Sequence, residues 1–207
     1  MTAPVCGVVL AGGLATRMGG GDKTLLEVDG ETILDRTLER IAPHCAEIVL
    51  NANGDLSRFA AFGLPIVGDS VPDFAGPLAG ILAGMDWAHE NHPEIEWMAS
   101  VPGDCPFLPR DLVPRLLEAA SKQNKQIACA KSSEWRHPLA AVWRVSLRHD
   151  LRRALVGDGV RKVEVWAARH GIAHAEWPDK PVDLFLNVNS PENLEEAERI
   201  AEAHPEL

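Results

Sequence analysis

Short apolar runs alternate with segments of helical spacing along almost the whole chain, and this alternation limits the fold more than any other feature of the sequence. We expect buried strands at residues 5–10, 47–52, 64–67, 97–101, 127–130, 139–143 and 182–188. We expect helices around residues 34–41, at 77–89, 112–120, 145–156 and 160–170, and from Pro191 onward, with Ser190 as the cap. This pattern predicts the α/β class: a single-domain, three-layer sandwich in which helices cover both faces of a mostly parallel sheet.

The formal charge of the 207 residues is −10, and it excludes several classes of protein. Proteins that coat nucleic acid bind it through Lys and Arg, so we expect no nucleic-acid partner. No stretch approaches the roughly 18 consecutive apolar residues that span a bilayer, and the N-terminus lacks a signal-peptide pattern. We therefore expect a cytoplasmic protein without a membrane partner. In that compartment the four widely spaced cysteines are expected to be reduced core thiols: Cys6, Cys45, Cys105 and Cys129.

A glycine-rich loop, residues 10–23, directly follows the first expected strand, and five of its fourteen residues are glycine. Backbone N–H groups without side-chain cover can surround an anion. Arg17 and Lys23 add positive charge to the same loop, and this combination suits a triphosphate. The loop is not a Walker A motif, because Asp22 precedes Lys23. It is not a GxGxxG motif either, because Thr24 stands where the third glycine would be.

Further short motifs follow the glycine loop in order over nearly the whole chain. The loop itself reads LAGG-x3-RMGG-x-DK. The later motifs are Asn51, Val67-Gly68-Asp69, Gly76-Pro77-Leu78-Ala79-Gly80, Pro102-Gly103-Asp104-Cys105-Pro106, His137-Pro138 and Asn187-Val188-Asn189. The ordered set resembles the molybdenum cofactor guanylyltransferase family, which belongs to the nucleotidyltransferases of Rossmann-like fold.

The resemblance implies a reaction in which GMP is transferred from GTP to the terminal phosphate of molybdopterin. The products are the guanine dinucleotide cofactor and pyrophosphate. The resemblance also implies one nucleotidyltransferase domain over residues 1–207, whose N-terminal half binds GTP and whose C-terminal half binds molybdopterin. Such attack on an α-phosphorus is catalysed mainly by neutralising and aligning charge. Because the nucleophile is already an ionised phosphate, no Ser, Cys or His base is required.

The resemblance assigns catalytic and nucleotide-binding roles to the glycine loop. It places Lys23 on the phosphates, where a flexible ammonium group can follow charge as pyrophosphate departs. Arg17 is the second cationic candidate, because its planar guanidinium can hold two phosphate oxygens. A solvated loop arginine is the alternative. The resemblance also places four residues against the nucleotide: Leu10, Ala11, Gly12 and Gly13.

Three polar residues follow expected strands and complete the predicted GTP site. Asp104 is the best metal ligand, bridging Mg²⁺ to the triphosphate, because Mg²⁺ prefers carboxylates, water and substrate phosphates. A local turn is the alternative role for this Asp. The resemblance assigns Asn51 and Asp69 to GTP. The Asn51 amide can hydrogen-bond to a base or ribose, and a turn-forming role is the alternative. Asp69 can accept hydrogen bonds from guanine N1–H and N2–H₂ or from a ribose hydroxyl.

The second substrate is expected to lie near a locally basic stretch. Residues 131–170 carry nine Lys or Arg and four acids, whereas residues 191–207 carry six Glu and one Arg. Within the basic stretch, Arg136, Arg161 and Lys162 lie near expected loops and are candidates for binding molybdopterin. Asn187 and Asn189 would share one face of a strand end, and the resemblance directs them to the second substrate or the metal. Solvated helix surface and helix capping are the alternatives.

Three other functions fit parts of the pattern. Cytidylyltransferase relatives resemble this family but typically carry LAAG at residues 10–13, so LAGG favours GTP. A sugar-phosphate nucleotidyltransferase is a more distant alternative. A non-catalytic GTP-binding adaptor that delivers cofactor to a molybdoenzyme would not require Lys23 and Asp104 together. We expect a monomer whose partners are GTP, molybdopterin and, beyond these, other cofactor assembly proteins and target molybdoenzymes.

Overall fold

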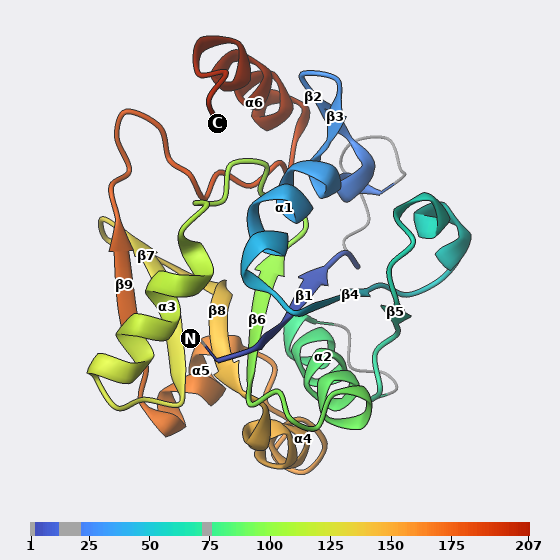
Figure 1. Cartoon of the computed structure of the whole chain (residues 1–207), viewed down its shortest axis with the longest axis vertical. Coiled ribbons are helices and arrows are strands. Elements are labelled where there is room, and N and C mark those ends of the chain that lie inside the picture. The colour runs from blue at the N-terminus through green and yellow to red at the C-terminus, as the bar shows by residue number, and fades with distance from the viewer. Residues whose placement is uncertain (1–2, 13–21, 72–75) are drawn as a thin grey trace.

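A seven-stranded sheet runs through the middle of the computed structural model, which describes residues 3–12, 22–71 and 76–207 (Figure 1). The strands lie in the order β5 (Ile66–Val67), β4 (Glu47–Asn51), β1 (Val5–Leu10), β6 (Trp97–Pro102), β8 (Trp135–Arg144), β7 (Ile127–Ser132) and β9 (Ala173–Trp177). Every neighbouring pair is parallel except the two pairs that include β8. The prediction of a mostly parallel sheet is therefore confirmed.

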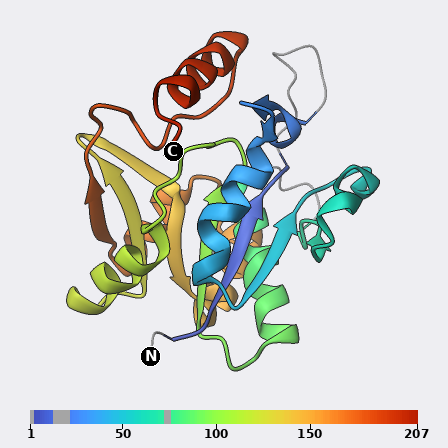
Figure 2. The ribbon, with the colours of Figure 1, turned by 45° about the horizontal axis from the view of Figure 1, so that its top comes forward.

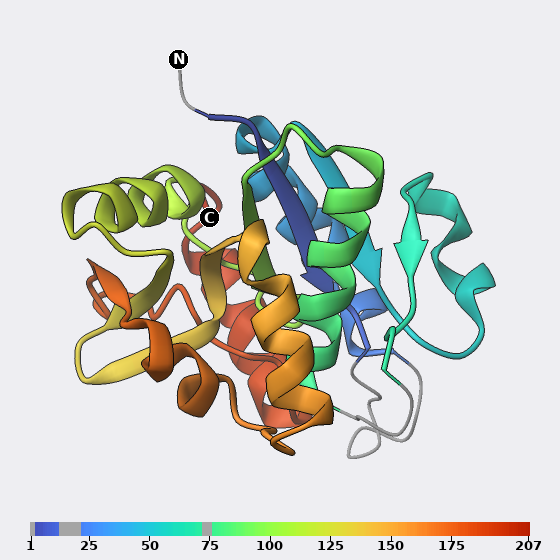
Figure 3. The same ribbon diagram turned by 90° about the horizontal axis from the view of Figure 1, so that it is seen from below.

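Helices cover both faces of the sheet (Figure 3). One face carries α1 (Ile33–Ile41) and α3 (Leu112–Lys122), and the other carries α2 (Pro77–Asn91), α4 (Arg148–Val156) and α5 (Val163–Ala167). Strand β1 serves both layers, because successive side chains of a strand point to opposite faces. Val5 and Val9 join the core beneath α1 and α3, whereas Cys6 and Val8 join the core beneath α2, α4 and α5. The three-layer α/β fold is confirmed.

A smaller core joins the C-terminal helix to a hairpin near the start of the chain (Figure 2). The helix is α6 (Pro191–Ala203), and the hairpin joins β2 (Glu27–Val28) to β3 (Glu31–Thr32). Val28 packs with Ala197 and Ala201 of the helix, and all three are buried. Arg36 is also buried, and its Nε donates to the carbonyl oxygen of Val28 at 3.0 Å. These contacts hold the segment before α6 close to the carboxyl ends of the central strands.

The segment at 182–188 differs from the prediction. A strand there is wrong, because these described residues form turns and irregular backbone. The amide of Phe185 donates to Oδ1 of Asp183 at 3.0 Å, which fixes a local turn. The apolar side chains then pack in two directions, with Phe185 against Trp177 and Leu186 against the core of α6. The seventh strand is instead β9, whose mixed AHAEW sequence lacks an apolar run because it lies at the edge of the sheet.

One helix begins where its capping signal predicts, and another is shorter than predicted. The amide of Asn193 donates to Oγ of Ser190 at 3.4 Å, so α6 begins as predicted with Pro191 in its first turn. The helix predicted at 160–170 is shorter, because α5 begins at Val163 and continues as a 3₁₀ turn, η6 (Ala168–His170). No helix in the described part of the chain is long and apolar enough to cross a membrane.

Candidate active site

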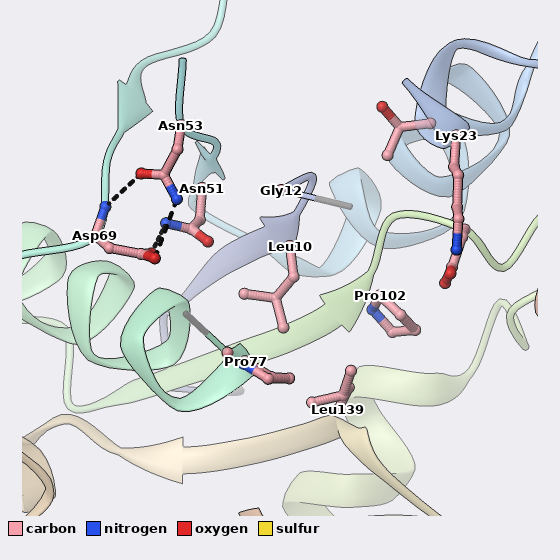
Figure 4. A pocket seen from close by; sticks show the side chains of 12 residues that line it. Leu10, Gly12, Lys23, Asn51, Asn53, Asp69, Pro77, Pro102 and Leu139 are labelled. Atoms are coloured by element: carbon pink, nitrogen blue, oxygen red, sulfur yellow. Dashed lines mark hydrogen bonds between the residues drawn. The ribbon is translucent and has the colours of Figure 1, made fainter. Parts of the chain in front are cut away.

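A cavity of about 300 Å³ lies at the carboxyl ends of the parallel strands, where α/β sheets bind ligands (Figure 4). Each of four neighbouring strands contributes residues to it at or shortly after its carboxyl end. The contributions are Leu10 and Gly12 from the end of β1, Asn51 and Asn53 from the end of β4, Asp69 after β5 and Asp104 after β6. Lys23, at the C-terminal end of the glycine loop, also lines the cavity. The fold therefore brings the strand-end residues singled out in the sequence into one cavity.

Gly12 and Ala11, two neighbouring residues of the glycine loop, have different surroundings: Gly12 lines the cavity and Ala11 is buried. A Cβ added to Gly12 would find no described atom within 4 Å, so packing within this part of the protein does not require glycine there. Glycine instead leaves space in the cavity wall. Ala11 is fully buried, and its amide donates to the carbonyl oxygen of Asn51 at 2.8 Å, so it fastens β1 to β4. Gly13 and Arg17 lie outside the described residues.

Lys23 begins a short 3₁₀ turn, η2 (Lys23–Leu25), which Asp22 caps. Oδ1 of Asp22 accepts from the amide of Thr24 at 3.1 Å and from its hydroxyl at 2.7 Å. The Lys23 ammonium group donates to Oδ1 of Asn189. Asn189 therefore lies beside Lys23, on an irregular segment and not on the predicted strand. A role for Asn189 toward the second substrate or the metal stays a prediction.

Asp104 lines the same cavity as Lys23, and the two opposite charges interact. Burial raises the pKa of its carboxyl group above the usual value, and the nearby Lys23 ammonium opposes part of that rise. Hydrogen bonds hold the loop after β6, which carries Asp104, on both sides. The amide of Gly103 donates to Leu10 O at 3.1 Å, and the amide of Val188 donates to Asp104 O at 2.8 Å. The loop also packs closely: a Cβ on Gly103 would lie 2.5 Å from Cγ2 of Thr24.

Cys105, next to Asp104, is a packed thiol. It is 1% exposed, and burial raises its pKa well above the usual value. Its Sγ donates to Oδ1 of Asn187 at 2.9 Å. A protonated buried thiol is a poor nucleophile. The contact instead ties the segment before α6 to the loop that carries Asp104.

Asn51, Asn53 and Asp69 form a hydrogen-bonded cluster at the opposite end of the cavity from Lys23 (Figure 4). Nδ2 of Asn51 donates to Oδ1 of Asp69 at 3.1 Å, and Nδ2 of Asn53 donates to Oδ2 at 3.0 Å. The Asp69 amide donates back to Oδ1 of Asn53 at 3.0 Å. Two asparagines therefore orient one carboxylate. Sequence reasoning missed Asn53, although it stands two residues after Asn51 and so on the same side of the extended chain.

Helix α2 makes room for this cluster at Gly80. A Cβ at that position would lie 2.2 Å from Oδ1 of Asn51 and 2.9 Å from Cδ2 of Leu10. The glycines of the 76–80 motif thus have two roles. Gly76 lines the cavity with its φ at 152°, and Gly80 allows close packing between the helix and Asn51.

A second cavity of about 190 Å³ adjoins the first, and the two share Pro102 and Leu139 in their walls. It exists because β8 bulges: Cys129 pairs with Ala141, whereas the next residue, Ala130, pairs with His137. Residues 138–140 therefore project from the ladder, as bulges near active sites commonly do. The hydroxyl of Ser100 donates to Leu139 O at 2.7 Å and fixes the bulge.

His137 and Phe185 form the aromatic part of this second cavity. Their rings stack with centroids 4.1 Å apart and an interplanar angle of 10°. The His137 Nε2 shares a hydrogen bond of 2.7 Å with the Ser132 hydroxyl, and burial lowers the pKa of the imidazole. Sequence reasoning noted His137 only as part of a motif and missed Phe185. Their pairing depends on the bulge and on the irregular segment, neither of which has a signal in the sequence.

Four of the residues predicted for the second substrate divide into two groups. Arg136 and Asn187 line the second cavity. Arg161 and Lys162 lie before α5 and are absent from the described lining of both cavities. Nη1 of Arg161 donates to the carbonyl oxygens of Leu155 at 3.2 Å and Val160 at 3.1 Å. A role for any of the four in binding molybdopterin stays a prediction.

Comparisons with known proteins identify the family of the chain. The model of the MobA-like NTP transferase domain family matches residues 7–172. A protein of Nitrobacter hamburgensis named molybdenum cofactor guanylyltransferase is 54% identical over 198 residues, which cover 96% of this chain and 95% of that protein. A protein of the same name from Rhodopseudomonas palustris (strain BisB5) is 55% identical over 194 residues, covering 94% of this chain and 92% of that protein.

Solved structures agree with the fold. Molybdopterin-guanine dinucleotide biosynthesis protein A from Archaeoglobus fulgidus has a TM-score of 0.74 at 24% identity, covering 96% of this chain and 99% of that chain. A protein from Mycobacterium tuberculosis H37Rv, in complex with manganese, has a TM-score of 0.68 at 21% identity, covering 95% of this chain and 99% of that chain. By its domain and its relatives, the chain belongs to the molybdenum cofactor guanylyltransferase family of MobA-like nucleotidyltransferases.

Proposed function

We propose that the protein transfers GMP from GTP to the terminal phosphate of molybdopterin, forming the guanine dinucleotide cofactor and releasing pyrophosphate. Membership of the guanylyltransferase family supports this reaction. The observation that carries it is the division of one cavity into a cationic end at Lys23 and an amide–carboxylate end at Asn51, Asn53 and Asp69. A nucleoside triphosphate has the same division between its phosphates and its nucleoside.

The nucleoside lies, in this proposal, at the asparagine–aspartate end. Both carboxylate oxygens of Asp69 are held in place by amide donors, so the group is oriented before a ligand arrives. It can accept from guanine N1–H and N2–H₂ or from a ribose hydroxyl, and Asn51 adds an amide beside it. Leu10 and Gly12 form the floor, where the open space at Gly12 allows the nucleotide to approach the backbone.

The triphosphate lies toward Lys23. Its ammonium group donates to Asn189 in the structure, and a phosphate oxygen is a stronger acceptor because it is charged. Lys23 can therefore exchange one partner for the other without moving its backbone. We assign Arg17 and Gly13 to the same phosphates on the resemblance alone.

Asp104 fits a divalent cation. Its half-buried carboxylate lines the cavity. Its described contacts are its own backbone amide and a weak thiol contact of 3.9 Å to Cys105, so oxygen lone pairs remain for a metal. No cluster of three or more His, Cys, Asp or Glu is found in the described ranges, so phosphates and water would supply the other ligands, as Mg²⁺ commonly requires. Bound Mg²⁺ would neutralise phosphate charge. The manganese complex of a structural neighbour supports a divalent ion in this fold.

The reaction then needs alignment and no protein base. An oxygen of the ionised molybdopterin phosphate forms a bond to the α-phosphorus of GTP. The bond from that phosphorus to the bridging oxygen breaks, and pyrophosphate leaves with both electrons of that bond. Lys23 stays beside the departing charge. Catalysis of this kind comes from fixed cations and from holding the two phosphates in line.

Molybdopterin lies, in this proposal, in the second cavity. The stacked rings of His137 and Phe185 offer a flat apolar wall to a pterin, and Arg136 and Asn187 offer polar contacts to it or to its phosphate. Pro102 and Leu139 belong to both cavities, so a phosphate passing over them reaches the end of the first cavity that holds Asp104 and Lys23. In this division the N-terminal half binds GTP and the C-terminal half binds the acceptor.

An assay of pyrophosphate release tests the proposal. The protein is incubated with Mg²⁺, molybdopterin and either GTP or CTP, and a parallel reaction omits molybdopterin. We expect release with GTP that depends on molybdopterin. Greater pyrophosphate release with CTP would identify a cytidylyltransferase. Release with a sugar 1-phosphate in place of molybdopterin would identify a sugar nucleotidyltransferase. GTP binding without pyrophosphate release would identify a non-catalytic adaptor.

A further inference from the structure

Arg58 connects the two ends of the nucleotide cavity, although it does not line the cavity in the part of the chain that the structure describes. It belongs to the 3₁₀ helix η4 (Leu56–Phe62), which follows β4. All three guanidinium nitrogens have partners: Nε donates to Asp22, Nη2 to the carbonyl oxygen of Asn53 and Nη1 to that of Asp55. The guanidinium also lies 4.5 Å from the ring centre of Phe59, which is 1% exposed. These contacts fix the arginine in one position.

One partner of Arg58 sets the position of the phosphate-binding lysine. The Asp22 side chain is 4% exposed, and its Oδ2 lies 2.8 Å from Nε of Arg58. Its other oxygen caps η2, which begins at Lys23. Thr24, in the same turn, is buried against Gly103 beside Asp104. A shift of Asp22 would therefore move the backbone of Lys23 and disturb the packing behind Asp104.

Another partner of Arg58 sets the position of the nucleoside end. Nη2 lies 3.0 Å from the carbonyl oxygen of Asn53. The Asn53 side chain in turn makes two hydrogen bonds with Asp69, one in each direction and each of 3.0 Å. A shift of the Asn53 backbone would therefore move the carboxylate that we assign to the nucleoside.

We propose that Arg58 is a positioning residue that fixes the distance between the phosphate end and the nucleoside end of the cavity. The inference rests on the proposed function, because it assumes that one nucleotide spans both ends. Its consequence is specific. A ligand that reaches both ends gains from their fixed spacing, since the second contact is then made at high effective concentration. A ligand that occupies one end gains nothing from it.

Three ligands distinguish this role from a structural one. GTP spans the cavity, guanosine occupies the nucleoside end, and pyrophosphate occupies the phosphate end. We would measure the dissociation constant of each for the wild-type protein, for Arg58→Gln and for Asp22→Asn/Arg58→Gln. The double variant removes one charge of each sign, keeps an oxygen to cap η2 and so avoids leaving an unpaired carboxylate near the phosphates. Arg110→Gln is the matched control, because Arg110 pairs with Glu39 at 2.9 Å elsewhere on the surface.

We expect the double variant to bind GTP about tenfold or more weakly, with the affinities for guanosine and pyrophosphate within about threefold of wild type. Retained guanosine binding also demonstrates that the variant is folded. GTP affinity within threefold of wild type would overturn the inference. An equal loss for guanosine and GTP would overturn it too, because Arg58 would then support Asn53 alone.

Arg58→Lys keeps the inference testable if the glutamine variants do not fold. A lysine can pair with Asp22 but cannot also reach Asn53 with a planar fork. We expect an intermediate loss of GTP affinity with unchanged guanosine binding, and wild-type affinity for GTP would contradict the inference. Failure of wild-type protein to release pyrophosphate would refute the proposed function instead, and the comparison of GTP with guanosine would still report on Arg58.

Discussion

The two adjoining cavities are built in different ways. The first is formed by residues at or just beyond the carboxyl ends of parallel strands, such as Asn51 in β4, Asp69 after β5 and Asp104 after β6. The second is formed by a bulge in the antiparallel strand β8 and by the irregular segment before α6. Residues after parallel strands must converge at one edge of the sheet, whereas a bulge depends on the pairing of one strand with its neighbours. The position of the first cavity therefore follows from the order of the parallel strands. The position of the second follows from the shifted pairing between β7 and β8.

The largest expected effect concerns charge at the phosphate end of the first cavity. Lys23→Ala or Asp104→Ala should lower the rate of pyrophosphate release by about 10²–10³, because each removes a group that neutralises or organises phosphate charge. Lys122→Ala is the control, since Lys122 is an exposed surface residue paired with Glu118. Rates within tenfold of wild type in both site variants would remove these residues from the catalytic machinery.

The next effect tests whether the second cavity receives the acceptor. Arg136→Ala should raise the KM for molybdopterin by about 10- to 100-fold, which corresponds to the loss of a hydrogen bond to a charged group. The dissociation constant for GTP should not change, because Arg136 lines the second cavity and not the first. Lys131→Ala, which removes a nearby charge paired with Glu176, is the matched control. A KM for molybdopterin like that of wild type would move the acceptor site elsewhere.

Gly12, which lines the first cavity, and Gly80, which packs against Asn51, should respond differently to an added methyl group. Gly80→Ala should destabilise the protein by about 1–3 kcal/mol and weaken GTP binding, because its Cβ would lie 2.2 Å from Oδ1 of Asn51. Gly12→Ala should weaken GTP binding without lowering the melting temperature, since its Cβ would meet no described atom within 4 Å. Thermal unfolding and GTP titration measure both. Unchanged GTP affinity in Gly12→Ala would mean that the nucleotide does not occupy that space.

The smallest effect concerns pH and His137. Burial lowers the pKa of this imidazole, partly opposed by Asp183, so the unfolded chain binds more protons near pH 6.5 than the folded protein does. Stability should therefore be lost as pH falls through this region, with a slope from this group of at most about 1.4 kcal/mol per pH unit. His137→Gln should flatten the dependence between pH 8 and pH 5.5 in chemical denaturation. The difference at pH 8, where the imidazole is neutral, measures lost packing alone, and an unchanged slope would contradict the prediction.

The sequence predicts the first cavity better than the second. The strands around β1 have largely apolar sequences because they are buried on both faces, and the sequence predicts a site from the polar residues at their carboxyl ends. Asn53 carries the same signal, because it stands two residues after Asn51 at the end of a strand. Arg58 carries none, because its role depends on a contact with Asp22 from a distant segment. The strand predicted at 182–188 failed because an apolar run can pack against two cores without pairing in a sheet.

The central claim is that the two cavities hold the two substrates of one GMP transfer. The most direct measurement follows isotopic phosphorus from GTP labelled at either the α- or the γ-position, with Mg²⁺ and molybdopterin present. We expect the α-label on the pterin and the γ-label in pyrophosphate, in equal amounts. A γ-label on the pterin, or both labels remaining in intact GTP, would contradict it.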